Sequence, residues 1–170
     1  MTTSNQRFLP ELKIDQLFPN EGRRLREIRL RALRADPHAF ETTFEQASAW
    51  HSERWSQQLE ALVTFVATLD NADVGMVRGA RNEQLRDAGH LISMWVARES
   101  RRQGIGSALV DSVILWARNE GLTQLFLDVR EGNKAALALY ASRRFAPTGE
   151  VKVMPPPRED VREIEMSLNL

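Results

Sequence analysis

Three arginines and two glycines stand close together near the middle of the chain, and their residue types suit the binding of an anion. They are Arg98, Arg101, Arg102, Gly104 and Gly106. Glycine lets an anion approach the backbone closely, and guanidinium groups supply positive charge. The start of a helix adds unpaired backbone N–H groups and the positive end of the helix dipole. A helix that begins at these glycines would make the segment a phosphate-binding site.

The flanking residues supply the strand and the helix that such a site needs. The apolar run from Leu91 to Val96 predicts a strand that ends just before the arginines. Apolar residues then recur near the period of a helix, and they are Leu109, Val110, Val113, Ile114 and Ala117. A turn that carries glycines only for a tight connection is the alternative, and the arginines and both flanking elements argue against it.

The spacing of the glycines separates different kinds of phosphate loop. A P-loop needs Gly-Lys followed by Ser or Thr, and this triplet does not occur in the chain. A dinucleotide-binding loop needs a third glycine where this sequence has Leu109. The pattern that remains is Arg-x-x-Gly-x-Gly, formed by Arg101, Gly104 and Gly106.

A second group of candidate residues follows the predicted strand Leu125 to Val129. Asn133 suits the first position of a helix, because its side-chain oxygen can accept an early backbone N–H. Ala136, Leu137 and Tyr140 then share one face of that helix. Tyr140 is the only tyrosine in the chain. Core packing and proton donation are both open for it at this point.

Together the two motifs resemble those of the GNAT superfamily of acyl-CoA N-acyltransferases, over roughly Leu62 to the C-terminus. The resemblance implies acetyl-CoA as co-substrate and Tyr140 as the general acid. It implies a pyrophosphate loop formed by Arg101, Arg102, Gln103, Gly104, Ile105, Gly106 and Ser107. It further implies cofactor contacts from Asn133, Ala136 and Tyr140, and pairing of the pantetheine arm with the backbone of Met94, Trp95 and Val96.

The resemblance also points to a candidate for the base that accepts the amine proton. His90 lies at the strand position where the histone-acetylating branch of the superfamily has a glutamate. A histidine titrates near neutral pH and suits this task. The alternative is that His90 only ends a strand and faces solvent. Glu41, Glu45 and Asp128 are weaker candidates for the base.

One position departs from the family pattern. The family usually has glycine where this chain has Arg144, directly before Phe145. A glycine after a helix commonly adopts the left-handed conformation that ends the helix. We therefore expect Arg144 either to adopt that conformation at some cost or to end the helix differently.

Composition limits the function further. A chain of 170 residues with 42% hydrophobic residues suits one globular domain, residues 1–170, of which 1–8 are expected to be loose. Lys plus Arg and Asp plus Glu both number 23, so charge gives no reason to expect a nucleic-acid partner. The arginines between residues 23 and 34 predict a solvated helix face. No cysteine is present, which excludes disulfides and thiolate metal sites, and we expect no metal. No signal peptide or membrane span is recognisable, which favours a cytoplasmic location.

The pattern along the chain predicts the α/β (α+β) fold class, with a mixed, mostly antiparallel sheet of about seven strands and about four helices. The predicted order is β-α-α-β-β-β-α-β-α-β-β, and the resemblance to the GNAT superfamily implies that the fourth and fifth strands splay apart. Asn20 is expected to cap the first helix, and Thr42 with Glu45 has the spacing of a capping box for the second. Pro155 to Pro157 are expected to form a stiff turn before the last strand.

These observations predict an N-acetyltransferase that moves the acetyl group of acetyl-CoA to a primary amine of a small molecule or peptide by direct attack. A non-catalytic acyl-CoA-binding or regulatory module of the same fold is the alternative, because an intact phosphate loop would serve both. The last strand, Ile164 to Leu168, has no proline, so we expect it to be an open edge that favours a homodimer.

Overall fold

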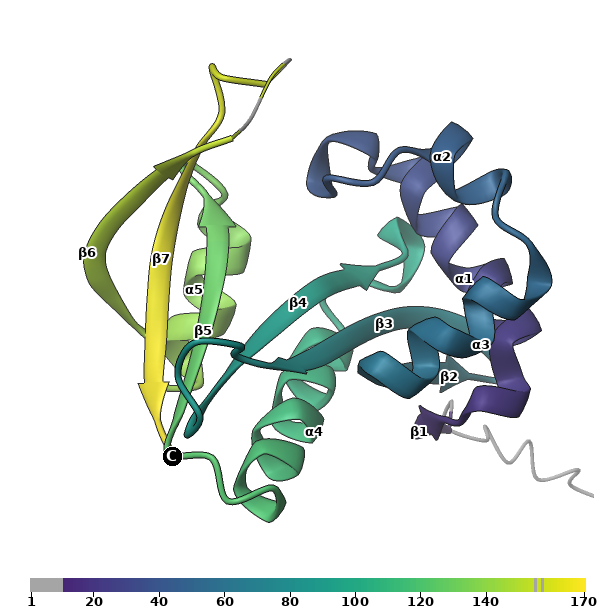
Figure 1. Cartoon of the computed structure of the whole chain (residues 1–170), viewed down its shortest axis with the longest axis horizontal. Helices are drawn as coiled ribbons and strands as arrows, with labels where there is room; N and C mark the ends of the chain where they lie inside the picture. Colours follow the sequence, from purple (N-terminus) through teal and green to yellow (C-terminus); the bar gives the residue numbers. More distant parts are fainter. Residues whose placement is uncertain (1–10, 155, 157) are drawn as a thin grey trace, which may run out of the picture.

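The computed structural model describes residues 11–154, 156 and 158–170. Within these residues seven strands form one sheet in the order β1-β2-β3-β4-β5-β7-β6 (Figure 1). The strands are β1 (Leu12–Leu17), β2 (Val63–Leu69), β3 (Ala72–Arg81), β4 (Ala88–Val96), β5 (Gln124–Arg130), β6 (Ala146–Val153) and β7 (Arg162–Asn169). The predicted loose residues 1–8 and two prolines of the predicted turn, Pro155 and Pro157, lie outside the described residues.

Over the same part of the chain there are five α-helices and three short 3-10 helices. The α-helices are α1 (Gly22–Ala35), α2 (Phe44–Ser48), α3 (Ser52–Ala61), α4 (Ile105–Asn119) and α5 (Lys134–Ser142). The 3-10 helices are η1 (Pro19–Glu21), η2 (Pro37–Ala39) and η3 (Arg98–Ser100). The mixed sheet and the element order confirm the predicted fold class.

The sheet opens between its two central strands. All neighbouring strands pair antiparallel except β4 and β5, which run parallel. That parallel pairing covers only Ala88 to His90 of β4, against Gln124 to Phe126 of β5. Among the described residues, the rest of β4 has no partner in β5. The predicted splay is therefore confirmed, and Figure 1 shows the two strands diverging.

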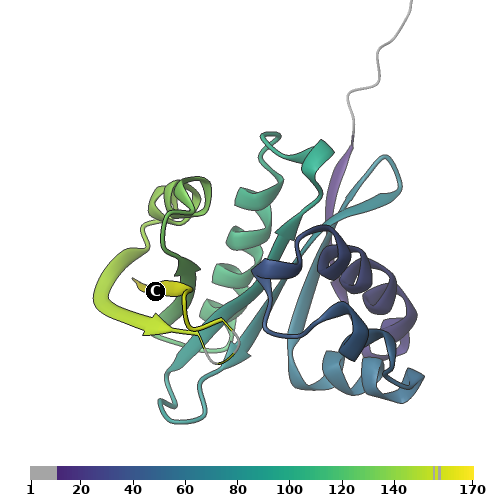
Figure 2. The ribbon, with the colours of Figure 1, turned by 90° about the horizontal axis from the view of Figure 1, so that it is seen from above.

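Helices cover both faces of the sheet, and each face has its own apolar core. One core joins α4 and α5 to the sheet, with Leu109, Val113 and Leu127 fully or nearly fully buried. The other joins α1, α2 and α3 to β2, β3 and β4, and includes Trp55 and Trp95. Figure 2 shows α1 to α3 gathered beside the β1–β4 half, with α5 beside the β5–β7–β6 half.

The N-terminal helices begin at other residues than predicted. Asn20 lies inside η1 and does not cap α1. At the start of η1, the carboxylate of Glu21 accepts the backbone N–H of Phe18. The capping box of α2 is Thr43 with Gln46, one residue later than the predicted pair Thr42 and Glu45. Both pairs have the required spacing, so local sequence does not choose between them.

The predicted second helix is also two helices, because the chain turns after Ser48. This turn folds the ring of Trp50 onto that of Trp55, with 4.9 Å between the ring centroids. Trp55 is thereby buried under α1.

Two further predictions about exposure are wrong. The last strand β7 lies between β5 and β6, so β1 and β6 are the edges of the sheet and β7 is not. The arginines of α1 do not all face solvent either. Arg24 forms ion pairs with Asp15 and Asp73, and Arg29 is buried.

Candidate active site

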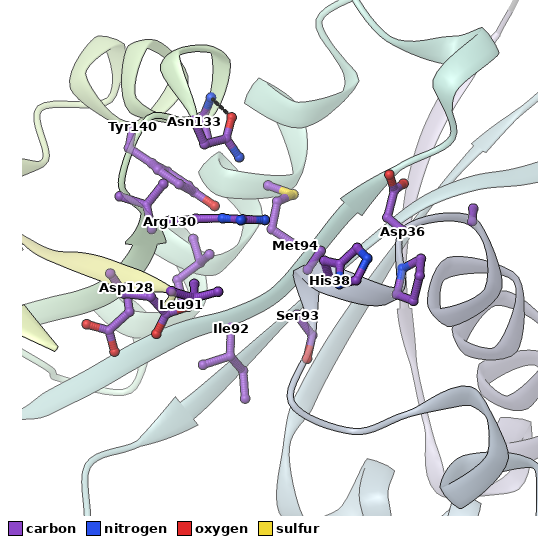
Figure 3. Close-up of a pocket in the computed structure, with 17 residues that line it drawn as sticks. Asp36, His38, Leu91, Ile92, Ser93, Met94, Asp128, Arg130, Asn133 and Tyr140 are labelled. Atoms are coloured by element: carbon purple, nitrogen blue, oxygen red, sulfur yellow. Dashed lines mark hydrogen bonds between the residues drawn. The ribbon is translucent and has the colours of Figure 1, made fainter. Parts of the chain in front are cut away.

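A cavity of about 400 Å³ lies where β4 and β5 separate. Figure 3 shows side chains from three parts of the chain meeting there: β4, the segment from β5 into α5, and the segment after α1. The lining residues used below are Asp36, Leu91, Ile92, Ser93, Met94, Asp128, Asn133, Ala136, Tyr140 and Glu163. The gap therefore brings residues of the second motif beside the strand that leads into the glycine loop, whereas the loop itself does not line this cavity.

The backbone of β4 is irregular beside this cavity. Met76 of β3 pairs with Trp95 and Arg78 pairs with Ile92, so Val77 faces two residues of β4. This bulge includes Ser93, whose φ of 55° lies in the left-handed region. It turns the side chain of Trp95 to the α1 face, while Met94 and Val96 pack with the α4 face. Within the described part of the chain, the β5 side of Met94, Trp95 and Val96 has no strand partner, so an extended ligand could pair with it.

The side chains of Trp95 and Arg101 are hydrogen-bonded to other residues of the protein. The carboxylate of Asp36 accepts the indole N–H of Trp95 at 2.8 Å. The same carboxylate pairs with Arg101, which also donates to the carbonyl of Val96 at 2.8 Å. These bonds tie the end of β4 to η2. The guanidinium of Arg101 is therefore already bonded within the protein. Trp95 and Arg101 are in position to contact a ligand through their backbone groups.

The glycine loop leads directly into α4, as predicted. Gly104 has a φ of 79°, and a side chain there would meet nothing within 4 Å. The carbonyl of Gly104 accepts the N–H of Ala108, so the N–H groups of Ile105, Gly106 and Ser107 lie in the first turn of α4, where no preceding turn supplies a carbonyl to accept them. Arg102 and Gln103 are exposed beside them. The loop therefore presents free donors and positive charge to one open space.

Ile105 and Gly106 also have structural tasks. The side chain of Ile105 is buried in the core, so only its backbone can reach a ligand. A Cβ atom on Gly106 would lie 3.1 Å from a methyl group of Leu139. Glycine at this position lets α4 approach α5 closely.

Asn133 and Tyr140 lie on α5 at the other side of the gap (Figure 3). The side chain of Asn133 caps the helix by accepting the N–H of Ala136 at 3.1 Å, which confirms the predicted cap. Tyr140 is 6% exposed and packs edge-on against Phe145. Its hydroxyl end is turned toward the gap. Burial raises the pKa of Tyr140 above its ordinary value, so the phenol keeps its proton at neutral pH.

His90 lies on the opposite face of β4 from Leu91 and lines a second, smaller cavity instead of the gap. Its Nε2 is 2.8 Å from the side-chain amide of Asn82, and its ring stacks at a tilt with Phe126. Burial lowers the pKa of His90 below its usual value; the charge of Asp128 opposes this effect, that of Lys152 adds to it and that of Glu165 opposes it. His90 is therefore neutral at pH 7.

Glu163 is a candidate residue that sequence reasoning missed. It lines both cavities, together with Asp128. Burial and the carboxylates of Asp128 and Glu41 raise the pKa of Glu163. Nothing in the alternating pattern of β7 marks this residue, because its neighbours depend on the strand order. Of the acids named from the sequence, Glu41 and Asp128 line the second cavity with Glu163, and these three residues are called the acidic group below. Glu45 lines a separate groove beside Phe44.

Arg144 adopts the left-handed conformation, with a φ of 69°. The N–H of Phe145 then bonds to the carbonyl of Tyr140 at 3.1 Å, and that of Arg144 to Ala141 at 3.0 Å. The helix thus ends as a glycine-terminated helix would, and Tyr140 keeps its place. This is the first of the two outcomes expected for Arg144.

The sequence model of the acetyltransferase (GNAT) family matches residues 24–145, and the chain belongs to this family. It is 31% identical over 119 residues to [ribosomal protein bS18]-alanine N-acetyltransferase of Escherichia coli K12, over 63% of this chain and 78% of that protein. It is 33% identical over 103 residues to an N-alpha-acetyltransferase of Saccharolobus solfataricus, over 55% of this chain and 60% of that protein. Human N-acetyltransferase 8 is 37% identical over 89 residues, which are 51% of this chain and 39% of that protein.

Solved structures agree in fold. An acetyltransferase of the GNAT family from Streptococcus pneumoniae has a TM-score of 0.79 at 22% identity, over 94% of this chain and 99% of that chain. A protein from Salmonella typhimurium, solved with its cofactor acetyl-CoA, has a TM-score of 0.77 at 17% identity, over 94% of both chains. The Escherichia coli ribosomal-protein-S18-alanine N-acetyltransferase has a TM-score of 0.68 at 25% identity, again over 94% of both chains.

No helix in the described part of the chain is both long enough and apolar enough to cross a bilayer. No group of three or more His, Asp or Glu side chains in that part of the chain is arranged to hold a metal ion.

Proposed function

We propose that this protein transfers the acetyl group of acetyl-CoA to a primary amine of a small molecule or a peptide, by direct attack of the amine. Membership of the GNAT family supports the type of reaction. The observation that carries the proposal for this chain is the gap between β4 and β5, which lies between Tyr140 and the unpaired backbone of β4. The glycine loop at the start of α4 follows directly from the end of that strand.

The residues around the gap fit acetyl-CoA. The open space at Gly104, the free N–H groups that follow it and the charge of Arg102 suit a pyrophosphate. The unpaired β5 side of Met94, Trp95 and Val96 suits an amide-bearing arm, which would extend the sheet. Asn133 and Ala136 line the same cavity from α5. Bound acetyl-CoA supplies a thioester, and no covalent nucleophile of the protein is required.

Acyl transfer to an amine needs a stabilised carbonyl oxygen, a proton for the departing thiolate and an acceptor for the amine proton. A backbone N–H near Val96 is proposed to stabilise the oxygen. Tyr140 is proposed to protonate the thiolate, since its hydroxyl faces the gap and stays protonated at neutral pH. His90 remains the proposed base, and Glu163 is a second candidate because it lines the gap itself.

The acceptor is proposed to bind on the α1 face of the gap, near Glu41 and Glu163 and beside Asp128, whose carboxylate is paired with Lys152 at 2.9 Å. Carboxylates attract the ammonium form of an amine and orient it before its proton is lost. The names of the Escherichia coli and Saccharolobus solfataricus relatives give alanine and N-alpha amines as their acceptors. An α-amine is therefore included among the proposed acceptors.

Three further sequence predictions stay predictions: a cytoplasmic location, the absence of a nucleic-acid partner and a homodimer. The homodimer no longer rests on β7. The edge strand β6 is the better candidate for pairing, because Val151 and Val153 are exposed on it. A monomeric mass by light scattering, unchanged on raising the concentration, would contradict the dimer.

The proposal is tested by measuring release of free CoA from acetyl-CoA over a panel of primary amines. Tyr140→Phe should lower kcat by about a hundredfold. Its affinity for acetyl-CoA and its thermal stability should stay near those of the wild type, because the ring keeps its packing against Phe145. Tight acetyl-CoA binding without turnover of any amine would favour the non-catalytic module. No binding of acetyl-CoA would contradict the site itself.

A further inference from the structure

Arg29 of α1 and Arg78 of β3 are buried on the sheet face that carries α1, with exposures of 6% and 5%. A buried guanidinium group is costly unless a carboxylate or several hydrogen bonds compensate its charge. Among the described residues neither arginine forms an ion pair. Arg78 donates only to uncharged groups, on Gln58 and Thr64.

Arg29 is the less satisfied of the two. Its guanidinium lies over the ring of Phe40, 4.3 Å from the centroid. Its Nη1 is buried and has no hydrogen-bond partner within the described residues. Burial lowers the pKa of Arg29 to about 10, and burial with the charge of Arg29 lowers that of Arg78 to about 10. Both groups remain cations at neutral pH, so two positive charges without an anion share this region.

Both arginines line the second cavity, of about 320 Å³, which also holds His90 and the acidic group. This cavity shares Ile92, Ser93, Asp128 and Glu163 with the cavity in the gap. The two cavities are therefore neighbours. A molecule in the second cavity could place one end beside the proposed reaction site.

The positive and negative side chains of this cavity lie on different strands, and the order of the strands in the sheet keeps them apart. Arg78 is on β3, Asp128 is on β5 and Glu163 is on β7, with β4 between the first two. Neighbouring strands lie about 4.8 Å apart, so the cationic end and the acidic end are separated by about 10 Å or more along the sheet. Asp128 is paired with Lys152 at 2.9 Å, whereas Glu163 forms no ion pair among the described residues. The cavity therefore presents the two arginines at one end and the carboxylate of Glu163 at the other.

We infer that the acceptor carries a carboxylate as well as its amine, and that Arg29 and Arg78 bind this carboxylate while the amine lies at Glu163. The inference rests on the proposed function, since it names the acceptor class for the same site. A carboxylate fits a guanidinium because both are planar and form paired hydrogen bonds. Amino acids and short peptides with a free carboxylate are acceptors of this class.

The first experiment needs no variant. Amino acids with increasing distance between amine and carboxylate, and short peptides, are each compared with their carboxamides as acceptors of acetyl-CoA. The best acid should exceed its amide by about tenfold or more in kcat/KM, mainly through KM, because a charged hydrogen-bonded pair is lost in the amide. The amine-to-carboxylate distance of the acceptor with the largest acid-to-amide ratio then reports the spacing between the cationic and acidic ends of the cavity.

The second experiment assigns the preference to the arginines. Arg29→Met should reduce the acid-to-amide ratio to about threefold or less, because the cation is gone. Arg29→Lys should keep a larger part of it. Arg26→Met on the exposed side of the same helix should keep the full ratio. Thermal unfolding checks that each variant is folded.

The outcomes separate this inference from the proposed function. Turnover of amines with no preference for acids, or a preference that Arg29→Met leaves intact, overturns the inference alone. Where turnover is too slow to compare, calorimetry on the CoA-saturated protein measures the affinity for acid and amide, and equal affinities overturn it as well. Failure to bind acetyl-CoA overturns the proposed function first.

Discussion

The side-chain amide of Asn82 donates a hydrogen bond to Nε2 of His90 across 2.8 Å. The direction follows from the rest of the loop, because Oδ1 of Asn82 already accepts the N–H groups of Gln84 and Leu85. Its NH₂ group is therefore the part that faces His90. Nε2 must accept, so the ring proton of the neutral imidazole lies on Nδ1. The basic lone pair of His90 is thus occupied in this structure.

The variant Asn82→Asp should raise the pKa of His90. The carboxylate keeps the oxygen that accepts from Gln84 and Leu85, but it replaces the donor to Nε2 with a negative charge. Both changes favour the protonated imidazole, in addition to the existing influence of Asp128 and Glu165. NMR titration of the His90 ring measures the shift. An unchanged titration would mean that this hydrogen bond does not hold His90 neutral.

If His90 accepts the amine proton, activity should rise with pH in a range below pH 6.5 and level off above it. The neutral form is the base, and the pKa of His90 is lowered by burial, with Asp128, Lys152 and Glu165 as the nearby charges. His90→Ala should remove this rise and lower kcat by about a hundredfold. Acetyl-CoA affinity should be unchanged. The pH–rate profiles are recorded with two acceptors of different basicity.

Two results would contradict a role for His90 as the base. One is a rise that survives His90→Ala and follows the basicity of the acceptor. The other is a rise that survives His90→Ala and disappears in Glu163→Gln, which would assign the proton to Glu163. Its raised pKa would place that rise above the usual range of a glutamate.

Gly104→Val should weaken acetyl-CoA binding strongly. A β-branched side chain would enter the open space at the start of α4 and would also oppose the left-handed backbone. Gly121→Val is the matched control, since Gly121 follows the other end of α4 with a φ of 72° and equally open surroundings. Both variants should lose about 1–2 kcal/mol of stability, and calorimetry should find weaker binding only in the first. Equal affinities of the two variants for acetyl-CoA would refute the phosphate-loop assignment.

Arg144→Gly should stabilise the protein by about 0.5–1 kcal/mol, because glycine adopts the left-handed conformation without the steric cost that Arg144 bears. Arg144→Ala removes the same charge but keeps the Cβ atom, so it should be no more stable than the wild type. Chemical denaturation of the three proteins measures the difference. Equal stabilities for glycine and alanine would mean that the conformation costs little here.

Local sequence was sufficient for the elements that follow from neighbouring residues. The cationic loop before α4 and the cap at Asn133 were predicted because helix starts depend on a few consecutive residues. The left-handed conformation of Arg144 was one of two outcomes expected because the family usually has glycine at this position. The capping box of α2 lies one residue later than predicted, since the adjacent pairs Thr42 with Glu45 and Thr43 with Gln46 both have the required spacing.

The sequence by itself contained both motifs, and through the family that these motifs resemble it predicted the gap between β4 and β5 and the place of Tyr140 beside it. Tertiary structure alone decided which side chains from distant segments meet. It brings the side-chain amide of Asn82 within hydrogen-bond distance of His90, pairs Arg101 with Asp36, and places Glu163 near Asp128. Strand order and the bulge at Ser93 set these contacts, because pairing between remote segments fixes which residues share a face and a one-residue shift reverses it.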